Sequence, residues 1–417
     1  MTSRPPAPSA QTWRLPGPTD TQGKTTAAMR PEPVADPLRC GVPVLTGCGP
    51  LTQAATAVIR LAAEQADQAE HDCQHSPALI AALRTAGFSR HFAPVNRGGG
   101  DSTFADYVQA IMVLGRVDAS VAWCAAVAAN TTRMATFLPA DGQAAVWGTA
   151  PDTMLAGALM PSGTAEPVDG GWLLTGAWPY LSGIHYADGA LVSCRVPIPN
   201  AALQVRLLFV PRDRFARVER TWTSIGMRAT GSDTLVLHRV FVPIAHTLTN
   251  TDLMAGTRGS DPVGVPHMAV SGLAFAGPLV GGARGALDAW LRLATAPGRA
   301  IDDAHRMIAS RSAAEIDTAE LLLRNAAETA DRDTMTAAKA AQAHRDHALA
   351  AELATTAVNR LFTTAGTRGG TQTEVLQRHW RDVNTAAAHP ALQFRLAAHD
   401  YAALLLPDPP RPAVDPT

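Results

Sequence analysis

The 417-residue chain carries 35 basic and 36 acidic side chains, so its formal net charge is −1. This balance excludes nucleic-acid or membrane-surface binding that is driven by bulk charge. Hydrophobic residues make up 47% and charged residues 17%, a globular composition with enough apolar side chains for a large core. No uncharged apolar run reaches about 18 residues, so no segment predicts a membrane span.

Residues 1–45 predict a disordered leader, because the first part is rich in Pro, Thr, Ser and Gly and lacks the apolar centre of a secretory signal. The cysteines are odd in number and scattered, which predicts free thiols in a reducing cytoplasm. They are Cys40, Cys48, Cys73, Cys124 and Cys194. His71–His75 groups three candidate metal ligands, but it only links an acidic helix to the next helix start, so we predict no metal site.

Residues 46–150 predict an N-terminal helical domain. Leu51–Glu70 repeats apolar residues every three or four positions, and a Ser-Pro pair then opens a shorter helix. Two later helices, Phe104–Val117 and Ser120–Phe137, have small uncharged residues around most of their circumference. This pattern predicts that they are central and buried.

Residues 151–262 predict a compact β domain, because short apolar or alternating runs are separated by turn residues. The predicted strands are Met154–Met160, Trp172–Trp178, Ala190–Val196, Val205–Val210 and Thr234–Val242. Residues 263–407 return to long Ala-rich helices and predict a C-terminal four-helix bundle with a break near Pro390, and residues 408–417 form a tail. A β module between two helical halves leaves a cleft where the three parts meet.

Four stretches carry the strongest functional signal. In Gly170–Gly183, the second half is a glycine-bounded run with two aromatic residues, a proline and one hydroxyl, which makes a poor core strand. The others are Asp118–Trp123, Gly226–Ser232, and Arg381–Asn384 followed by His389. With the order of elements, they resemble the acyl-CoA dehydrogenase fold and its oxygenase branch. That branch holds the oxygenase components of two-component flavin-dependent monooxygenases, such as 4-hydroxyphenylacetate hydroxylase, dibenzothiophene monooxygenase and amino-sugar nitrososynthases.

The resemblance covers roughly residues 51–406 and implies a mainly α fold with an inserted, barrel-like β domain, in a cytoplasmic homotetramer. It implies an enzyme that takes up reduced FMN or FAD, which diffuses from a separate flavin reductase. The enzyme would form a C4a-hydroperoxyflavin and hydroxylate a small aromatic or natural-product substrate, or N-oxidise an amine. The chain has no Gly-x-Gly-x-x-Gly fingerprint after a strand, which is consistent with flavin reduction elsewhere.

Ser182 is the predicted contact of flavin N5. A C4a-hydroperoxyflavin survives only in a dry pocket with a hydrogen bond near N5. A small hydroxyl beside Gly183 can lie flat against the ring, and the resemblance places this serine near N5. Trp178 and Trp123 are predicted walls of the flavin cavity, with ordinary core packing as the alternative for both.

The loop Gly226–Ser232 offers hydroxyls and backbone N–H groups to a ribityl-phosphate or pyrophosphate group, with Arg228 and Thr230 as the predicted cofactor contacts. The alternative for Arg228 is a surface arginine on a structural turn. His389 is the predicted general acid or base, because imidazole titrates near neutrality. Pro390 breaks the helix there and can aim the side chain into a cleft, although a structural histidine is the alternative.

Asn130 and Tyr180 complete the predicted substrate pocket with His389. Oxygenase relatives often carry a histidine near the position of Asn130, so the resemblance implies a different substrate. Asp382 lies seven residues before His389 and is a candidate to orient it, and His185 is a weaker second acid or base candidate.

The glutamate base of acyl-CoA dehydrogenases has no counterpart here. The family places it in one of two regions, which read Ala388–Ala391 and Phe275–Gly282 in this chain and contain no carboxylate. This absence favours an oxygenase. Two alternatives remain: a flavin dehydrogenase or desaturase with another base, and a non-catalytic flavin-binding or scaffold protein.

Overall fold

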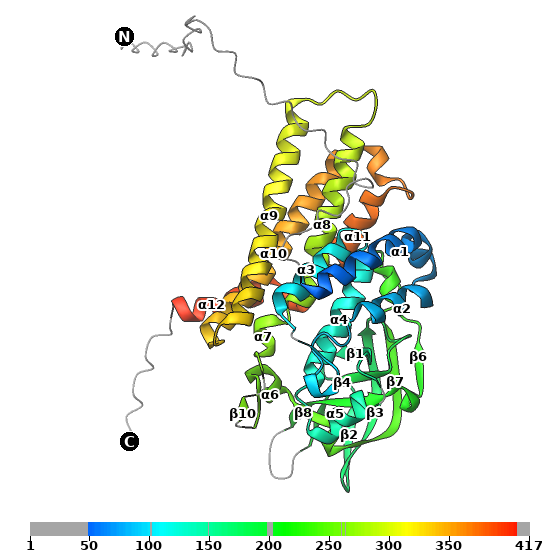
Figure 1. Ribbon diagram of the computed structural model, residues 1–417, viewed down its shortest axis with the longest axis vertical. Helices are drawn as coiled ribbons and strands as arrows, with labels where there is room; N and C mark the ends of the chain where they lie inside the picture. Colours follow the sequence, from blue (N-terminus) through cyan, green and yellow to red (C-terminus); the bar gives the residue numbers. More distant parts are fainter. Residues whose placement is uncertain are drawn as a thin grey trace, which may run out of the picture. The chain divides into compact units, whose positions relative to one another are not determined.

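The computed structural model describes residues 49–100, 102–148, 150–197, 203–259, 261–262 and 264–406, which all belong to one structural unit. The predicted leader, the predicted tail, Cys40 and Cys48 lie outside these residues. Helices come first, strands follow, and helices return, in the predicted order (Figure 1). No helix in the described part of the chain is both long and apolar enough to cross a membrane.

The first helices are α1 (Pro50–Asp72), α2 (Pro77–Ala86), α3 (Phe104–Gly115), α4 (Ala119–Ala135) and α5 (Ala140–Trp147). The strands are β1 (Leu155–Ala158), β2 (Thr164–Val168), β3 (Gly171–Leu181), β4 (Gly189–Val196), β5 (Gln204–Pro211), β6 (Arg217–Glu219), β7 (Asp233–Pro243), β8 (Thr247–Thr249), β9 (Thr257–Arg258) and β10 (Asp261–Pro262). The later helices are α6 (Asn250–Ala255), α7 (His267–Val270), α8 (Leu273–Ala294), α9 (Asp303–Arg332), α10 (Ala337–Thr364), α11 (Val375–Ala387) and α12 (Phe394–Leu405).

Helix α4 is the central helix that the sequence predicts. Asp118 directly precedes it, and its carboxylate accepts a 3.0 Å hydrogen bond from the backbone N–H of Val121 and caps the first turn. Every residue of α4 except Val127 is buried. Because most of these residues are small, α3 and α8 pack closely against it, and this fixes the side chain of Trp123.

The strands form two four-stranded sheets, ordered β1-β4-β5-β8 and β2-β3-β7-β6, and a two-stranded β9–β10 pair. The barrel-like expectation is therefore wrong for the described strands, because the edge strands of one sheet do not pair with those of the other. An apolar core that includes Leu174, Trp178 and Val192 fills the β domain.

A bulge near the end of β3 positions the most informative sequence motif. The register of β3 on β7 shifts between Trp178 and Leu181. Tyr180 in the bulge has a φ of 65°, a left-handed conformation that is uncommon for a residue with a Cβ. The bulge turns Tyr180 outward, where it is 71% exposed, and brings Ser182 to the turn directly after the strand.

In the C-terminal part, α8 packs against α9, α10 and α11, in line with the predicted helical bundle (Figure 1). Helix α11 ends at Ala387, and the short 3₁₀ helix η6 (Pro390–Leu392) follows with His389 as its N-cap. The predicted break near Pro390 is confirmed. Because the break comes beside α4 and α8, it places His389 next to the buried helices.

Candidate functional site

The site is built around Trp123 on α4. Its indole N–H donates a 2.9 Å hydrogen bond to the hydroxyl of Ser182, and both side chains are buried. The loop that carries Thr230 holds the turn after β3 in place, because the backbone N–H of Gly183 donates to the carbonyl of Thr230 at 2.9 Å. Gly183 has a φ of 73°, which explains why glycine occupies this position. Two predicted site residues, Trp123 and Ser182, are thus in direct contact.

A row of hydroxyls continues from Ser182 into the protein. Its Oγ lies 2.8 Å from Oγ of Ser232, which lies 2.7 Å from Oγ1 of Thr230. Thr230 in turn donates a 2.8 Å hydrogen bond to the carbonyl of Met227. The hydroxyl of the predicted cofactor residue Thr230 therefore bonds to its own loop and to Ser232, and it acts on Ser182 only through Ser232.

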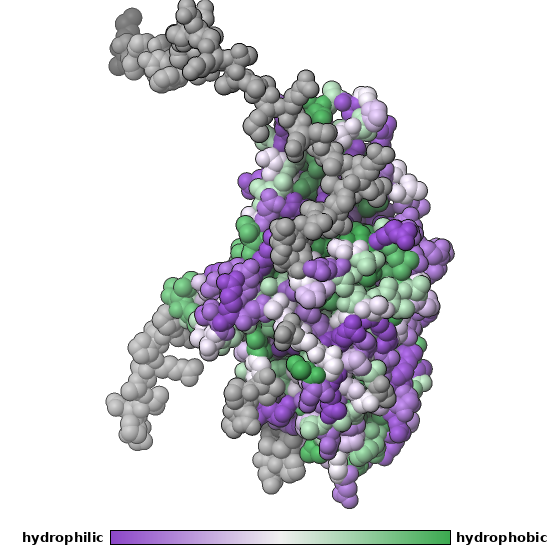
Figure 2. Space-filling model, in the orientation of Figure 1, coloured by the Kyte–Doolittle hydropathy of each residue, from purple (hydrophilic) through white to green (hydrophobic). Residues whose placement is uncertain are grey.

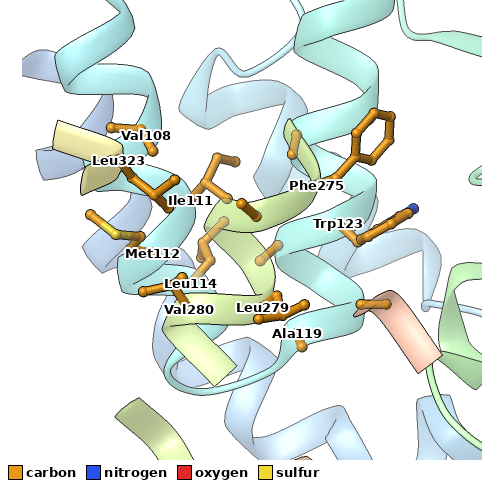
Figure 3. Packing of buried hydrophobic residues seen from close by; sticks show 14 of the residues in the cluster. Val108, Ile111, Met112, Leu114, Ala119, Trp123, Phe275, Leu279, Val280 and Leu323 are labelled. Atoms are coloured by element: carbon orange, nitrogen blue, oxygen red, sulfur yellow. The ribbon is translucent and has the colours of Figure 1, made fainter. Parts of the chain in front are cut away.

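The other side of Trp123 meets two further rings. Its ring centroid lies 5.2 Å from that of Phe275 on α8 and 5.7 Å from that of His389. Phe275 and His389 stack with 3.8 Å between centroids and 24° between planes. Figure 3 shows Trp123 and Phe275 pointing to the same side, away from the aliphatic residues Val108 and Ile111 of α3. Trp123 thus lies between the two predicted catalytic residues.

The imidazole of His389 is neutral and has a defined tautomer. Its Nδ1 accepts a 3.2 Å hydrogen bond from the backbone N–H of Ala391, which leaves the ring hydrogen on Nε2. Burial lowers its pKa to about 4. Within the described chain, Nε2 has no hydrogen-bond partner. The arrangement presents an N–H donor, while the predicted base function would require Nδ1 to release Ala391.

Asp382 does not orient His389, contrary to expectation. Its carboxylate accepts a 2.5 Å hydrogen bond from the backbone N–H of Met227 and holds the loop that carries Thr230. Burial, followed by the nearby charge of Asp118, raises the pKa of Asp382 to about 7. Asp382 therefore supports the row of hydroxyls from the bundle side.

Two predicted cofactor residues point elsewhere. Trp178 is fully buried in the β core, where its indole N–H donates to the carbonyl of Ser193 at 2.8 Å. Arg228 donates to the backbone carbonyls of Glu70 at 3.2 Å and Ser224 at 3.4 Å. We therefore assign Trp178 to the core and Arg228 to the anchoring of its loop on α1.

Asn130 lies seven residues after Trp123, on the same face of α4. Val127, between them on this face, is the one residue of α4 that is not buried. No side-chain hydrogen bond of Asn130 to another described residue is present. Tyr180 is not on this face of α4, because it lies in the bulge of β3, where its exposed ring meets Trp222 edge-on at 6.2 Å and 88°.

Comparison with known proteins identifies the family. Residues 273–394, which include Phe275 and His389, match the family described as acyl-CoA dehydrogenase, C-terminal domain. The chain is 30% identical over 346 residues to the FADH(2)-dependent resorcinol hydroxylase, oxygenase component, of Rhizobium sp. (strain MTP-10005), covering 76% of this chain and 84% of that protein. The chain belongs to the oxygenase components of the flavin-dependent monooxygenases.

A second relative is a monooxygenase, and a solved structure of similar fold holds a reduced flavin. The oxygenase subunit HsaA of Rhodococcus jostii (strain RHA1), a flavin-dependent monooxygenase, is 27% identical over 331 residues, covering 74% of this chain and 86% of that protein. The structure of XiaF from Streptomyces sp., in complex with FADH2 and glycerol, superimposes with a TM-score of 0.79 at 25% identity, covering 87% of this chain and 96% of XiaF.

These comparisons confirm the predicted acyl-CoA dehydrogenase fold, flavin cofactor and monooxygenase class. As an oxygenase component, this monooxygenase depends on a partner reductase for reduced flavin and acts on a small molecule. The dehydrogenase and scaffold alternatives receive no support.

The sequence did not single out three residues of this monooxygenase site. Ser232 lies in a loop whose hydroxyls were expected to face the cofactor. Phe275 is the one aromatic residue among small neighbours in a buried helical stretch, a signal that could have pointed to a pocket wall. Trp222 precedes the loop and carried no pattern of its own. All three are positioned by partners that are distant in sequence.

The weaker candidate, His185, has a structural partner. Its Nε2 lies 2.6 Å from the carboxylate of Asp233, which also accepts the backbone N–H groups of Thr221 and Trp222. Burial would raise the pKa of Asp233, but the hydrogen bonds from His185 and the two amides outweigh it and hold the pKa below its usual value. His185 thus fixes the start of β7 beside Ser232.

Proposed function

We propose that this protein hydroxylates a small aromatic substrate, with Ser182 holding reduced flavin and His389 holding the substrate. The observation that carries this proposal is the placement of Trp123 between them, bonded to Ser182 at 2.9 Å and 5.7 Å from the ring of His389. A flavin ring held by Ser182 and a substrate held by His389 would be neighbours across one indole.

The residues present fit a flavin. The oxygen of Ser182 accepts from Trp123 and contacts Ser232, and one further lone pair remains for the N–H at flavin N5. Tyr180, two residues before Ser182, pairs edge-on with Trp222, and the two rings offer apolar surface to a flat ligand. When bound, reduced flavin would supply the two electrons that activate dioxygen, so that one oxygen atom enters the substrate and the other leaves as water.

Among flavins we propose FADH2. The resorcinol hydroxylase that is 30% identical to this chain is FADH(2)-dependent, and XiaF binds FADH2. The guanidinium of Arg228 is already bonded to two backbone carbonyls. Backbone N–H groups, or residues of another subunit, would therefore bind the pyrophosphate of FAD. Competition between FADH2 and FMNH2 in anaerobic binding tests this choice, and tighter binding of FMNH2 would overturn it.

For the substrate we propose a phenol. A phenolic oxygen can accept the Nε2–H of His389, and Asn130, seven residues along α4 from Trp123, offers both an amide donor and an acceptor to a second polar group. The apolar surfaces of Phe275, Trp123 and Val127 suit the ring. Resorcinol, the substrate named in the relative from Rhizobium, has two such hydroxyls.

We also propose a cytoplasmic homotetramer. Helix α12 exposes apolar side chains at Leu396 (47%), Leu404 (47%) and Leu405 (64%), and Figure 2 shows hydrophobic surface at the end of this helix. Such a face is typical of a subunit contact. Three cysteines of the described chain are free, which suits a reducing compartment. Light scattering tests the assembly, and a monomer at micromolar concentration would contradict it.

The decisive test of the function is a single turnover with isotopically labelled oxygen. Protein and chemically reduced FAD are mixed without oxygen, and then exposed to ¹⁸O₂ with each member of a panel of small phenols. We expect a hydroxylated product that carries one ¹⁸O atom, with no reductase or nicotinamide present. Hydrogen peroxide as the sole product with every phenol of the panel would contradict the proposal.

A further inference from the structure

The hydrogen bonds behind Ser182 run in one direction. The row contains four contacts: Trp123 to Ser182, Ser182 to Ser232, Ser232 to Thr230, and Thr230 to the carbonyl of Met227. It also contains four hydrogens, one on the indole and one on each hydroxyl. The indole can only donate and the carbonyl can only accept, so all four contacts are made only if every hydrogen points toward Met227.

This direction determines what Ser182 can offer a ligand. Thr230 spends its hydrogen on the carbonyl of Met227, so Ser232 must donate to Thr230. Ser182 must then donate to Ser232, at 2.8 Å, and it receives the indole N–H of Trp123. Its hydrogen is committed, and to a ligand at this turn it presents only a lone pair. Ser182 is a hydrogen-bond acceptor there.

The two redox states of flavin differ at the atom that Ser182 is proposed to meet. Reduced flavin carries a hydrogen on N5, whereas oxidised flavin has a lone pair there. An acceptor bonds to the first and repels the second. We propose that the row from Ser182 through Ser232 and Thr230 to Met227 makes the site selective for reduced flavin over oxidised flavin. Ser232 and Thr230 are the positioning residues. This inference rests on the proposed function, because it requires flavin N5 at Ser182.

Such selectivity suits an oxygenase component. Reduced flavin arrives by release from a reductase, and oxidised flavin must leave before the next turnover. Oxidised flavin would compete with reduced flavin for a site that binds both states equally. A fixed acceptor separates the two states without any movement of the protein.

The test measures the affinity of each variant for both redox states. Fluorescence quenching gives the Kd of oxidised FAD, and the midpoint potential of bound FAD gives the ratio of the oxidised to the reduced Kd. In Ser232→Ala the hydroxyl of Ser182 loses its acceptor and can turn its hydrogen toward oxidised N5. We expect the ratio of the oxidised to the reduced Kd to fall about fivefold to tenfold, because the repulsive contact with N5 of oxidised flavin becomes a hydrogen bond. The midpoint potential then falls by ~20–30 mV.

Thr230→Val is the second variant and preserves the side-chain volume. It releases the hydrogen of Ser232, which can then point back to Ser182 and reverse the row. The same fall in the Kd ratio is expected, so the test stands even if one variant folds poorly. A structural defect would weaken the binding of both redox states and leave their ratio unchanged. Thermal unfolding of each variant checks the fold.

Ser193→Ala is the matched control. It removes a buried hydroxyl from β4 that has no hydrogen-bond partner in the described chain and is not part of the row. The ratio of the Kd values should stay at the wild-type value. If wild-type protein binds neither form of FAD, the proposed function itself fails. If wild-type protein binds both forms equally, or if Ser232→Ala and Thr230→Val keep the wild-type ratio, the selectivity fails while the proposed function stands.

Discussion

Two tryptophans of this protein look alike in sequence and differ in the structure. Trp178 is 0% exposed in the core of the β domain and donates its N–H to a backbone carbonyl. Trp123 is 8% exposed at the junction of α4, the hydroxyl row and the break after α11, and it donates to the hydroxyl of Ser182. A carbonyl partner only satisfies the buried indole N–H, whereas a hydroxyl that accepts this N–H can also form a hydrogen bond with a ligand. The partner of the indole, and not its burial, distinguishes the core from the site.

The largest effect should come from the core tryptophan. Replacing Trp178 with Ala removes a fully buried indole between the sheets, and we expect the free energy of unfolding to fall by about 3–5 kcal/mol. Chemical denaturation measures it. Reduced-flavin affinity of the remaining folded protein should stay within about twofold. A large loss of affinity without loss of stability would break the distinction between the two tryptophans.

His389 should come next, through binding of the substrate. His389→Leu removes the Nε2–H donor, and kcat/KM should fall about tenfold to a hundredfold, as when a hydrogen bond to a polar substrate group is lost. His389→Gln keeps an N–H donor and should recover most of the loss. Equal losses in both variants would show that the ring matters only for packing on Phe275.

The pH dependence gives a separate test of His389. Its folded pKa of about 4 lies below the usual 6.5, so the imidazole stays neutral and kcat/KM should be flat from about pH 5 to 8 as far as this group is concerned. Because the folded pKa is depressed, its neutral form favours the folded state, and this contribution is lost as the pH falls from 6.5 through 4. An acid limb near pH 6.5 that disappears in His389→Gln would contradict the buried environment.

Trp123→Phe tests the tryptophan of the site, for comparison with Trp178 in the core. The variant keeps an aromatic ring against Phe275 and loses the N–H donor to Ser182. We expect a loss of stability of about 1 kcal/mol, much less than for Trp178→Ala. The affinity for reduced FAD should fall about threefold to tenfold in anaerobic titration, because the lone pairs of Ser182 are no longer fixed. Trp178→Phe is the matched control, and its affinity should match wild type.

The smallest effect should come from Asp382, beneath the hydroxyl row. Its folded pKa of about 7 lies above the unfolded value near 3.8, so the folded state binds the extra proton and stability falls as the pH rises from about 4 to 7. Asp382→Asn removes this ionisation and keeps an oxygen for the N–H of Met227. We expect melting temperatures of the variant to depend less on pH across this range. An unchanged slope would show that Asp382 is ionised in the folded protein at low pH.

The sequence was sufficient for the order of the elements and for the burial of α4, because helical periodicity and small residues carry that information directly. It also singled out Ser182 and His389 by their glycine and proline neighbours, and the structure brings both side chains against Trp123. It could not separate Trp123 from Trp178. The bulge after Trp178 and the long-range contact of Trp123 with Ser182 decide their surroundings, and neither leaves a periodic signal.

Arg228 shows a second limit. A charged residue in a glycine-flanked loop looks like a phosphate ligand, but its partner is a carbonyl of Glu70, at the far end of α1. Capture by a backbone carbonyl that is distant in sequence depends on the packing of the whole domain. The same holds for Asp382, whose partner Met227 lies 155 residues away.

The central claim is that the oxygen of Ser182 accepts the hydrogen on N5 of reduced flavin. The most direct measurement is the NMR spectrum of anaerobic protein loaded with FADH2 that carries ¹⁵N at N5, recorded for wild type and for Ser182→Ala. The account predicts a hydrogen-bonded N5–H resonance, shifted downfield in wild type and returned toward the free position in Ser182→Ala, with both proteins saturated. An identical N5–H resonance in the two proteins would contradict it.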